Sequence, residues 1–170
     1  MLDQTNINEV LNNFAKYVIQ QSKTNLTKQK KNVKSSLYKS LDYTLNVSPN
    51  SFSMGFLMEE YGVFQDKGVS GTKKKYNTDF SFKSKQPPMK PILEWVNARG
   101  LRLRDAETGR FKKGGQKSLA FLIARSIKEK GIKPSLFFTK PFEKAFKKLP
   151  DDIVEAFSLD VEEFLKFTTK

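Results

Sequence analysis

Cysteine and histidine are both absent from this sequence of 170 residues. Without cysteine there is no disulfide framework and no thiolate chemistry, and without histidine the commonest general base and metal ligand is missing. These absences exclude most metallohydrolase and acyl-transfer mechanisms. Long apolar runs are missing too, because no segment approaches about 18 consecutive apolar residues and the first residues hold no apolar run of signal-peptide length. We therefore expect a soluble protein, made in the cytosol, that does not contact a membrane.

The sequence is rich in phenylalanine and lysine instead. Phenylalanine occurs 15 times and hydrophobic residues make up 38% of the chain, which is enough for a buried core although the mean hydropathy is −0.56. A chain of this length is the size of one domain.

The net charge of +13 is unevenly distributed along the chain. Residues 150–170 carry six acids and two lysines, a balance of −4, whereas residues 1–149 carry 29 bases and 12 acids, a balance of +17. A basic body with an acidic tail can bind a polyanion, or it can bind a neighbouring copy of itself head to tail.

The first third of the chain shows two periods. Apolar residues at three- and four-residue steps predict an amphipathic helix from about Asn8 to about Ser22. The leucine and valine spacing over residues 26–41 predicts a second helix or a continuation of the first. Between residues 43 and 58, apolar and polar residues alternate on both sides of a Pro-Asn turn, which predicts a β-hairpin.

The stretch 60-EYGVFQDKGVSG-71 follows the hairpin and combines two aromatic residues with three glycines. We expect Tyr61 and Phe64 to end the sheet or to begin a short third strand, with the glycines turning the chain. Residues 68–90 then hold six lysines after Gly68, one acid and three aromatic residues. A connection this long inside a compact domain is usually functional or disordered, so we expect a mobile arm that becomes ordered only against a partner.

The second half of the chain alternates helical and turn signals. Pro91 suits the first turn of a helix that stops at Gly100, and the basic stretch 101–115 predicts a second hairpin. A clear apolar stripe predicts a helix over 117–131, with Gly131 at its C-terminal cap. The phenylalanine-rich stretch 136–146 indicates a buried strand or turn leading into a short helix, and 151–167 predicts an amphipathic acidic helix.

Together these elements predict an α+β fold with a small antiparallel sheet. We expect a single domain over residues 1–149, with the long basic loop at 68–90, followed by a C-terminal acidic helix over residues 150–170.

Signals for catalysis are weak. The acidic pairs Asp105 with Glu107, and Glu59 with Glu60, are the nearest to a metal-dependent nuclease centre, but such pairs are mostly solvated or ion-paired surface acids. The glycine-rich loop that cradles phosphates in nucleotide-binding proteins is absent, since 71-GTKKKYN-77 lacks a second glycine. We expect no enzymatic activity, no cofactor and no metal, with a divergent nuclease on Asp105, Glu107 or Glu59 as a third hypothesis.

Nucleic-acid binding has more support, because basic residues are interleaved with Tyr76, Phe80, Phe82 and Phe111. Such a combination can neutralise phosphates and stack on bases. No helix-turn-helix, zinc finger or RNP-type motif is recognisable, so any contact with DNA would be non-specific. The candidate contacts to DNA or to a protein partner are Lys73, Lys74, Lys75, Lys83, Lys85, Arg102, Arg104, Arg110, Lys112 and Lys113.

Four segments occur in a suggestive order: 36-SLYKSLDYTL-45, a Tyr-Gly-x-Phe-x-Asp-x-Gly segment at 61–68, a helix with a Gly-Ile-x-Pro end at 119–134, and 136-LFFTKPFEKAF-146. This order resembles the phage tail-completion, or head-to-tail joining, family. The resemblance covers about residues 8–146, and segments 61–68 and 131–138 match best. The long loop at 68–90, the basic hairpin and the acidic helix after Pro150 depart from that layout.

The resemblance implies a small subunit in which a sheet packs against a long helix, and which forms a ring in the neck between portal and tail. Its partners would be copies of itself, the portal and other neck or tail proteins, and packaged DNA, and its location would be the virion, after synthesis in the host bacterial cytoplasm. Deleting residues 72–86 should then leave a folded protein that fails to enter particles. The candidate assembly contacts are Tyr61, Phe64, Asp66, Lys67, Phe157, Glu162 and Glu163.

Overall fold

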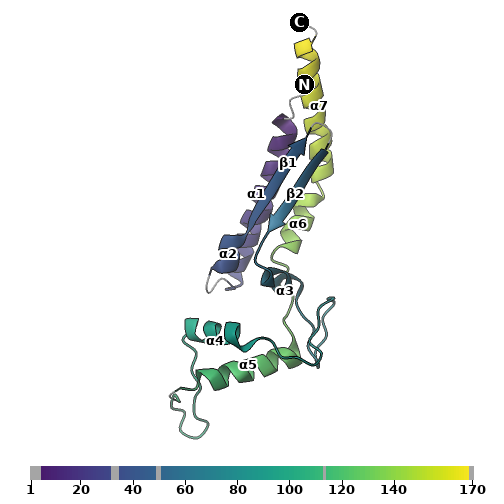
Figure 1. Cartoon of the computed structure of the whole chain (residues 1–170). Coiled ribbons are helices and arrows are strands. Elements are labelled where there is room, and N and C mark those ends of the chain that lie inside the picture. Colours follow the sequence, from purple (N-terminus) through teal and green to yellow (C-terminus); the bar gives the residue numbers. More distant parts are fainter. Residues whose placement is uncertain (1–4, 32–34, 49–50, 113, 169–170) are drawn as a thin grey trace. The chain divides into compact units, whose positions relative to one another are not determined.

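A computed structural model describes residues 5–31, 35–48, 51–112 and 114–168 (Figure 1). Within these ranges the protein is α+β, with seven helices and one two-stranded antiparallel sheet. The chain divides into two compact units. We call Met1–Asn32, Ser36–Glu59 and Phe137–Lys170 the first unit, and the continuous stretch Glu60–Leu136, which makes up nearly all of the other unit, the second unit.

This division differs from the expected single domain with a boundary near residue 149. The chain leaves the first unit after Glu59 and returns to it at Phe137, so residues distant in sequence complete one core. The C-terminal helix is part of that core, because it packs along the N-terminal helix.

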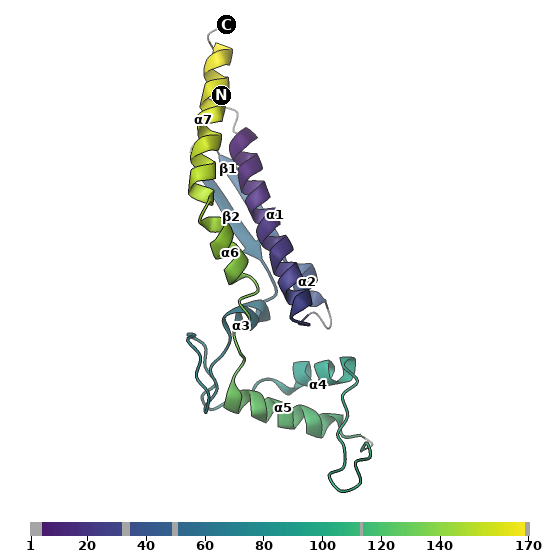
Figure 2. The same cartoon turned by 180° about the vertical axis from the view of Figure 1, so that it is seen from behind.

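The first unit places helices on one face of a β-hairpin, as Figures 1 and 2 show from opposite sides. Its elements are α1 (Thr5–Lys28), α2 (Ser36–Ser40), β1 (Asp42–Ser48), β2 (Ser51–Leu57), α6 (Thr139–Phe146) and α7 (Leu149–Thr168). The predicted hairpin is confirmed, with Tyr43 opposite Phe56 and Val47 opposite Phe52. Its expected Pro49-Asn50 turn lies outside the described residues.

The long N-terminal helix packs against this sheet, as expected. Buried residues recur along α1 at three- and four-residue steps, including Ile7, Leu11, Phe14 and Val18. Phe14 meets Phe56 of β2 and Phe142 of α6 edge-to-face, with ring centroids 6.2 and 5.8 Å apart. Such aromatic pairs contribute about 0.5–1.5 kcal/mol each beyond the burial of their area.

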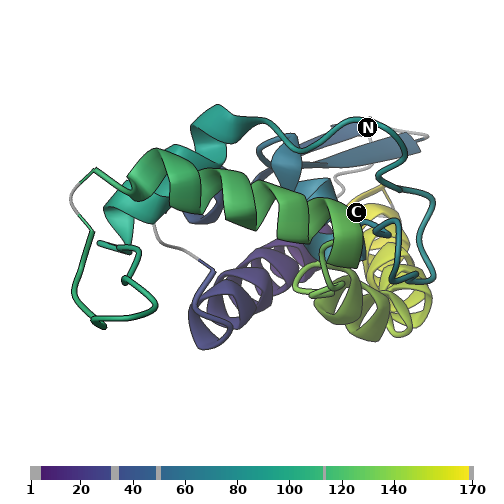
Figure 3. The same cartoon turned by 90° about the horizontal axis from the view of Figure 1, so that it is seen from below.

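The second unit contains α3 (Tyr61–Lys67), α4 (Met89–Ala98) and α5 (Gln116–Lys130), joined by long connections (Figure 3). The predicted helices near 91–100 and 117–131 are confirmed, and Gly131 caps α5 with a φ of 74°. Helices α4 and α5 pack against each other. The basic stretch 101–115 does turn back on itself, but through a single bridge between Arg104 and Phe111 and without a regular strand in its described part.

The expected strand end at Tyr61 and Phe64 is wrong, because these residues lie in α3. Their three-residue spacing suits one face of a helix, and the N–H of Gly68 ends that helix by donating to the carbonyl of Phe64. The backbone carbonyl of Asp66 accepts hydrogen bonds of 3.0 Å from the N–H groups of both Ser135 and Leu136. Contacts with a segment about 70 residues away in sequence therefore hold this short helix in place.

The expectation of a mobile arm at 68–90 is also wrong. Val69 and Ile132 exchange backbone hydrogen bonds of 2.9 and 2.8 Å, and Ser70 pairs with the backbone of Phe80 and Phe82 at 2.8 Å. The N–H groups of Thr72 and Lys73 each donate at 2.9 Å to carbonyls at the end of α5. Residues 68–82 are therefore ordered within the second unit itself, because backbone groups along this stretch have partners there.

Candidate assembly surface

The second unit contains a groove of about 670 Å³, which we call the apolar groove. It is bounded by α3, the segment 80–88, α4 and α5. Most of its surface is hydrophobic side chain, and pockets of this size and character are typical of binding sites. The lining residues are Tyr61, Phe64, Gln65, Val69, Phe80, Ser81, Phe82, Pro87, Pro88, Pro91, Ile92, Trp95, Ile123, Ile127 and Ile132.

Two of the predicted assembly contacts, Tyr61 and Phe64, lie in this groove and are 43% and 40% exposed. The ring of Phe64 meets that of Phe80 edge-to-face, at 4.8 Å between centroids. Lys67, on the same helix, is exposed. Asp66 does not belong with them, because it is buried, with 4% of its surface exposed.

Sequence reasoning missed most of the groove. It interpreted Pro91 only as the first turn of a helix, and the apolar stripe over 117–131 only as a helix signal. The chain's only tryptophan, Trp95, lines the groove and remains 39% exposed. The signal that could have found the groove is the crowding of prolines and aromatic residues between the lysines of residues 76–91.

Several of the predicted basic contacts are close in sequence to residues that line the apolar groove. Lys83 and Lys85 are exposed between the lining residues Phe82 and Pro87, and Lys75 is exposed as well. The other two lysines of the triplet have partners: Lys73 binds Glu129 at 2.8 Å, and Lys74 lies over the ring of Tyr76 at 5.5 Å.

The ion pair between Lys73 and Glu129 links the start of segment 73–84 to α5. The pKa of Glu129 is lowered by the hydrogen bond and charge of Lys73 and, to a lesser extent, by Arg125. Lys128 of the same helix donates a 2.7 Å hydrogen bond to the carbonyl of Ser84. Side chains of α5 therefore hold both ends of this segment.

The basic loop at 101–112 presents a cation stacked on an aromatic ring. The guanidinium of Arg104 lies 4.6 Å from the ring centroid of Phe111, which is 57% exposed. Arg102 and Arg110 are exposed on the same loop, Lys112 binds Asp105 at 3.0 Å, and Lys113 lies outside the described residues.

Asp105 builds the turn of this loop. Its carboxylate accepts hydrogen bonds from the backbone N–H groups of Thr108 and Glu107, at 3.0 and 3.1 Å. These contacts, with that of Lys112, hold the pKa of Asp105 below its ordinary value, the Thr108 bond having the largest effect. Among the described residues, no three acids cluster in a way that could hold a metal ion.

The second unit carries most of the positive charge. Residues 60–136 include 18 basic and 7 acidic residues, a balance of +11 out of the net charge of +13. The contrast expected between a basic body and an acidic tail is therefore chiefly a contrast between the second unit and α7.

Helix α7 has one face that is buried in the first unit and another that is exposed but also contains apolar residues. Leu149, Ala156 and Asp160 are buried, whereas Val154 and Phe157 are 66% and 48% exposed. Glu162 pairs with Lys166 at 2.7 Å on the exposed side, and that hydrogen bond lowers the pKa of Glu162. The predicted contacts Phe157, Glu162 and Glu163 are thus all accessible in the first unit.

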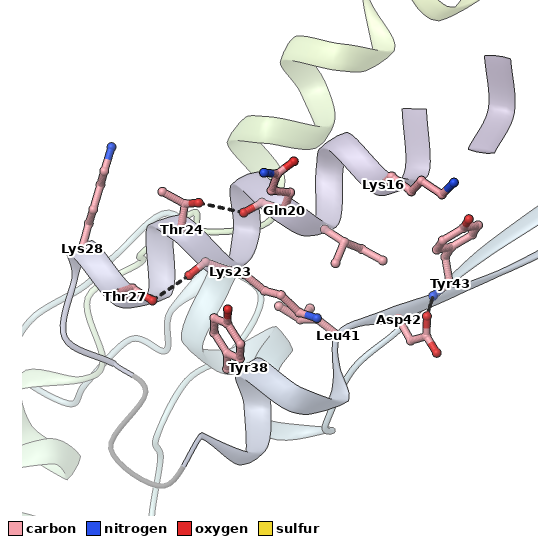
Figure 4. A pocket seen from close by; sticks show the side chains of 11 residues that line it. Lys16, Gln20, Lys23, Thr24, Thr27, Lys28, Tyr38, Leu41, Asp42 and Tyr43 are labelled. Carbon is pink, nitrogen blue, oxygen red and sulfur yellow. Dashed lines mark hydrogen bonds between the residues drawn. The ribbon is translucent and has the colours of Figure 1, made fainter. Parts of the chain in front are cut away.

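A second groove, of about 710 Å³, runs in the first unit between α1, α2 and the start of β1 (Figure 4). Lys16, Lys23 and Lys28 line it from α1, and Lys23 lies 5.4 Å from the ring of Tyr38. It is more polar than the apolar groove, and sequence reasoning did not identify it.

Comparison of the chain with protein-family models, with curated proteins and with solved structures finds no match. Among the described residues, no helix combines the length and apolar character that crossing a bilayer requires.

Proposed function

We propose that this protein is a structural subunit of a phage particle, which forms a ring in the neck that joins the portal-bearing head to the tail and helps to retain the packaged DNA. One observation carries most weight. A single chain presents an apolar groove in a unit of charge +11 and, elsewhere, a helix with exposed apolar and acidic side chains.

Two different complementary surfaces on one chain are what a head-to-tail contact requires. When the rotation between neighbours closes, such contacts generate a ring. Opposite charges on the two surfaces favour the correct orientation and disfavour contact between like surfaces. The order of segments that resembles the head-to-tail joining family points the same way, and the role needs neither catalysis nor a cofactor.

The experiment that tests this function is quantitative mass spectrometry of purified particles of the virus that encodes the chain. The copy number of this protein is measured against that of the portal subunit. A number comparable to that of the portal ring supports a neck subunit. Absence from the particle contradicts the proposal.

Non-catalytic, non-specific binding of nucleic acid is the second candidate, and the basic loop at 101–112 favours it. Arg104 stacked on the exposed ring of Phe111, with Arg102 and Arg110 nearby in sequence, combines positive charge with an accessible aromatic surface. Tight binding to duplex DNA at physiological salt, with a steep dependence of affinity on salt, would support it. Within a neck ring the same loop would face either the DNA or a neighbouring protein.

A further inference from the structure

We propose that the apolar groove of one copy receives helix α7 of the next copy. This docking rests on the proposed ring assembly and specifies its interface. The occupant is a second copy of this chain, and the contact is heterologous: α7 on one side, and α3, α4 and α5 with segment 80–88 on the other.

The groove has the character of a helix-binding site. Its volume is about 670 Å³, and its lining combines aromatic rings, prolines and isoleucines. Trp95, Tyr61 and Phe64 remain between 39% and 43% exposed in the isolated chain. Covering such rings with an amphipathic helix removes apolar area from water and is a recurrent mode of recognition.

Helix α7 presents a suitable face to enter the groove. Val154, Phe157 and Val161 are three and four residues apart, so they form one stripe along the helix. Val154 and Phe157 are strongly exposed, because α1 covers the adjacent face that contains Leu149, Ala156 and Asp160. The stripe is therefore available for contact while α7 stays in its own core.

Charges around the two surfaces are complementary. On α7, the exposed acids Asp151, Glu155 and Glu162 recur at four- and seven-residue steps and lie along one side of the stripe. Around the groove, the exposed bases within two residues of a lining residue in sequence are Lys67, Lys83, Lys85, Lys90, Arg125, Lys130 and Lys133. The exposed acids in comparable positions are fewer, namely Glu59, Glu60, Asp79 and Glu94. The second unit is nonetheless strongly positive, so an acidic helix is favoured over a basic one.

The chain's single tryptophan makes this docking directly measurable. Phe157→Glu places a charge on the α7 stripe and leaves the groove and Trp95 intact. Trp95→Glu disables the groove, leaves α7 intact and contains no tryptophan. When the two full-length variants are mixed, all tryptophan emission comes from the groove of the Phe157→Glu copy, and the only intact helix comes from the Trp95→Glu copy.

We expect the mixture to form a dimer and no larger oligomer, because each copy has only one intact surface. The Trp95 emission of the mixture should shift to shorter wavelength, and each variant alone should stay monomeric. Phe157→Glu should weaken self-association of the otherwise unchanged chain by more than about tenfold. Phe52→Glu, at a residue of β2 that is 47% exposed, is the matched control and should associate like the unchanged chain. Circular dichroism checks that each variant is folded. If Trp95→Glu does not fold, a variant that combines Trp95→Phe with Lys83→Glu and Lys85→Glu replaces it as the disabled groove, since it too contains no tryptophan.

Three results would overturn the docking. One is an unchanged emission spectrum in the mixture although the wild-type chain associates, since another surface would then make the contact. A second is a shifted emission that does not depend on protein concentration, since α7 would then occupy the groove of its own chain. A third is a wild-type chain that stays monomeric at every concentration reached. In all three cases the proposed neck function is judged separately, by the copy number in particles.

Discussion

Asp160 lies on the acidic helix α7, but it is buried and has a structural role. It is 1% exposed, and its carboxylate accepts 3.0 and 3.2 Å hydrogen bonds from the backbone N–H groups of Asn6 and Ile7. The side-chain amide of Asn6 adds a third bond of 2.8 Å. Because the N–H groups of a helix's first turn lack partners within the helix and carry partial positive charge, Asp160 caps α1 and joins α7 to it.

Asp160→Ala should therefore lower the free energy of unfolding by about 1–3 kcal/mol, since it leaves one buried and one partly buried N–H group without an acceptor. Chemical denaturation at low protein concentration measures this. Glu163→Ala, at an exposed position on the same helix, is the control and should change stability by less than about 0.5 kcal/mol. Equal stability of the two variants would show that the cap contributes nothing.

Gly131 allows the backbone at the end of α5 to approach the backbone of residues 69–71 closely. Its φ is +74°, and a Cβ atom there would lie 2.2 Å from the carbonyl oxygen of Val69 and 2.6 Å from the nitrogen of Gly71. An added methyl group would push the segment after α3 away from the end of α5.

Gly131→Ala should destabilise the second unit by roughly 2–5 kcal/mol, through backbone strain combined with steric overlap. Gly109→Ala provides the comparison, because Gly109 has a similar φ of +65° but nothing within 4 Å of an added Cβ. That change should cost only about 1–2 kcal/mol. Thermal unfolding followed by circular dichroism compares the two, and a Gly131→Ala variant as stable as Gly109→Ala contradicts the prediction.

At the scale of elements, the segment from residue 68 to 90 shows why composition misleads. Its lysines and prolines suggest a mobile arm, yet its backbone bonds to the end of α5 and to Ile132. These partners are far away in sequence, so no pattern within the segment predicts these hydrogen bonds. Deleting residues 72–86, which the sequence alone suggested would leave a folded protein, should instead disrupt the apolar groove.

The ion pair that secures this segment has a testable titration. Lys73 holds the pKa of Glu129 below its ordinary value of 4.5, so the pair stabilises the folded state above that value. Its contribution is lost as the pH falls through the lowered pKa. In Lys73→Met the pKa should rise towards 4.5 without reaching it, because Arg125 remains 3.5 Å away. NMR titration of the Glu129 carboxyl carbon measures this shift, and an unchanged midpoint would exclude the ion pair in solution.

At the scale of the whole molecule, the two units differ in how the chain builds them and in their net charge. The first unit is closed by residues from both ends of the chain, whereas the second unit is continuous and carries the charge of +11. Any contact with a polyanion should therefore depend mainly on the second unit.

Two sets of substitutions that each remove three positive charges test this. Arg102, Arg104 and Arg110 changed to Gln should reduce the slope of log affinity for duplex DNA against log salt by up to about 2.7. Lys16, Lys23 and Lys28 of the first-unit groove, changed in the same way, should leave that slope nearly unchanged. Filter binding over a range of salt concentrations compares them, and equal effects would mean that net charge alone governs the binding.

The sequence by itself determined the elements with long, regular patterns. It predicted α1, the β1–β2 hairpin, α5 and α7 and their apolar faces, because helical and strand periods are set by local backbone geometry. Of the assembly contacts that it predicted, Tyr61, Phe64 and Phe157 are exposed in the structure.

Only the tertiary structure decided how these elements combine. It placed Tyr61 and Phe64 in a helix, ordered the lysine-rich segment, buried Asp66 and Asp160, and assembled the groove around Trp95. Each of these features depends on hydrogen bonds or packing between residues far apart along the chain. The free energy of such contacts belongs to pairs of segments, and the pattern within one segment contains little information about it.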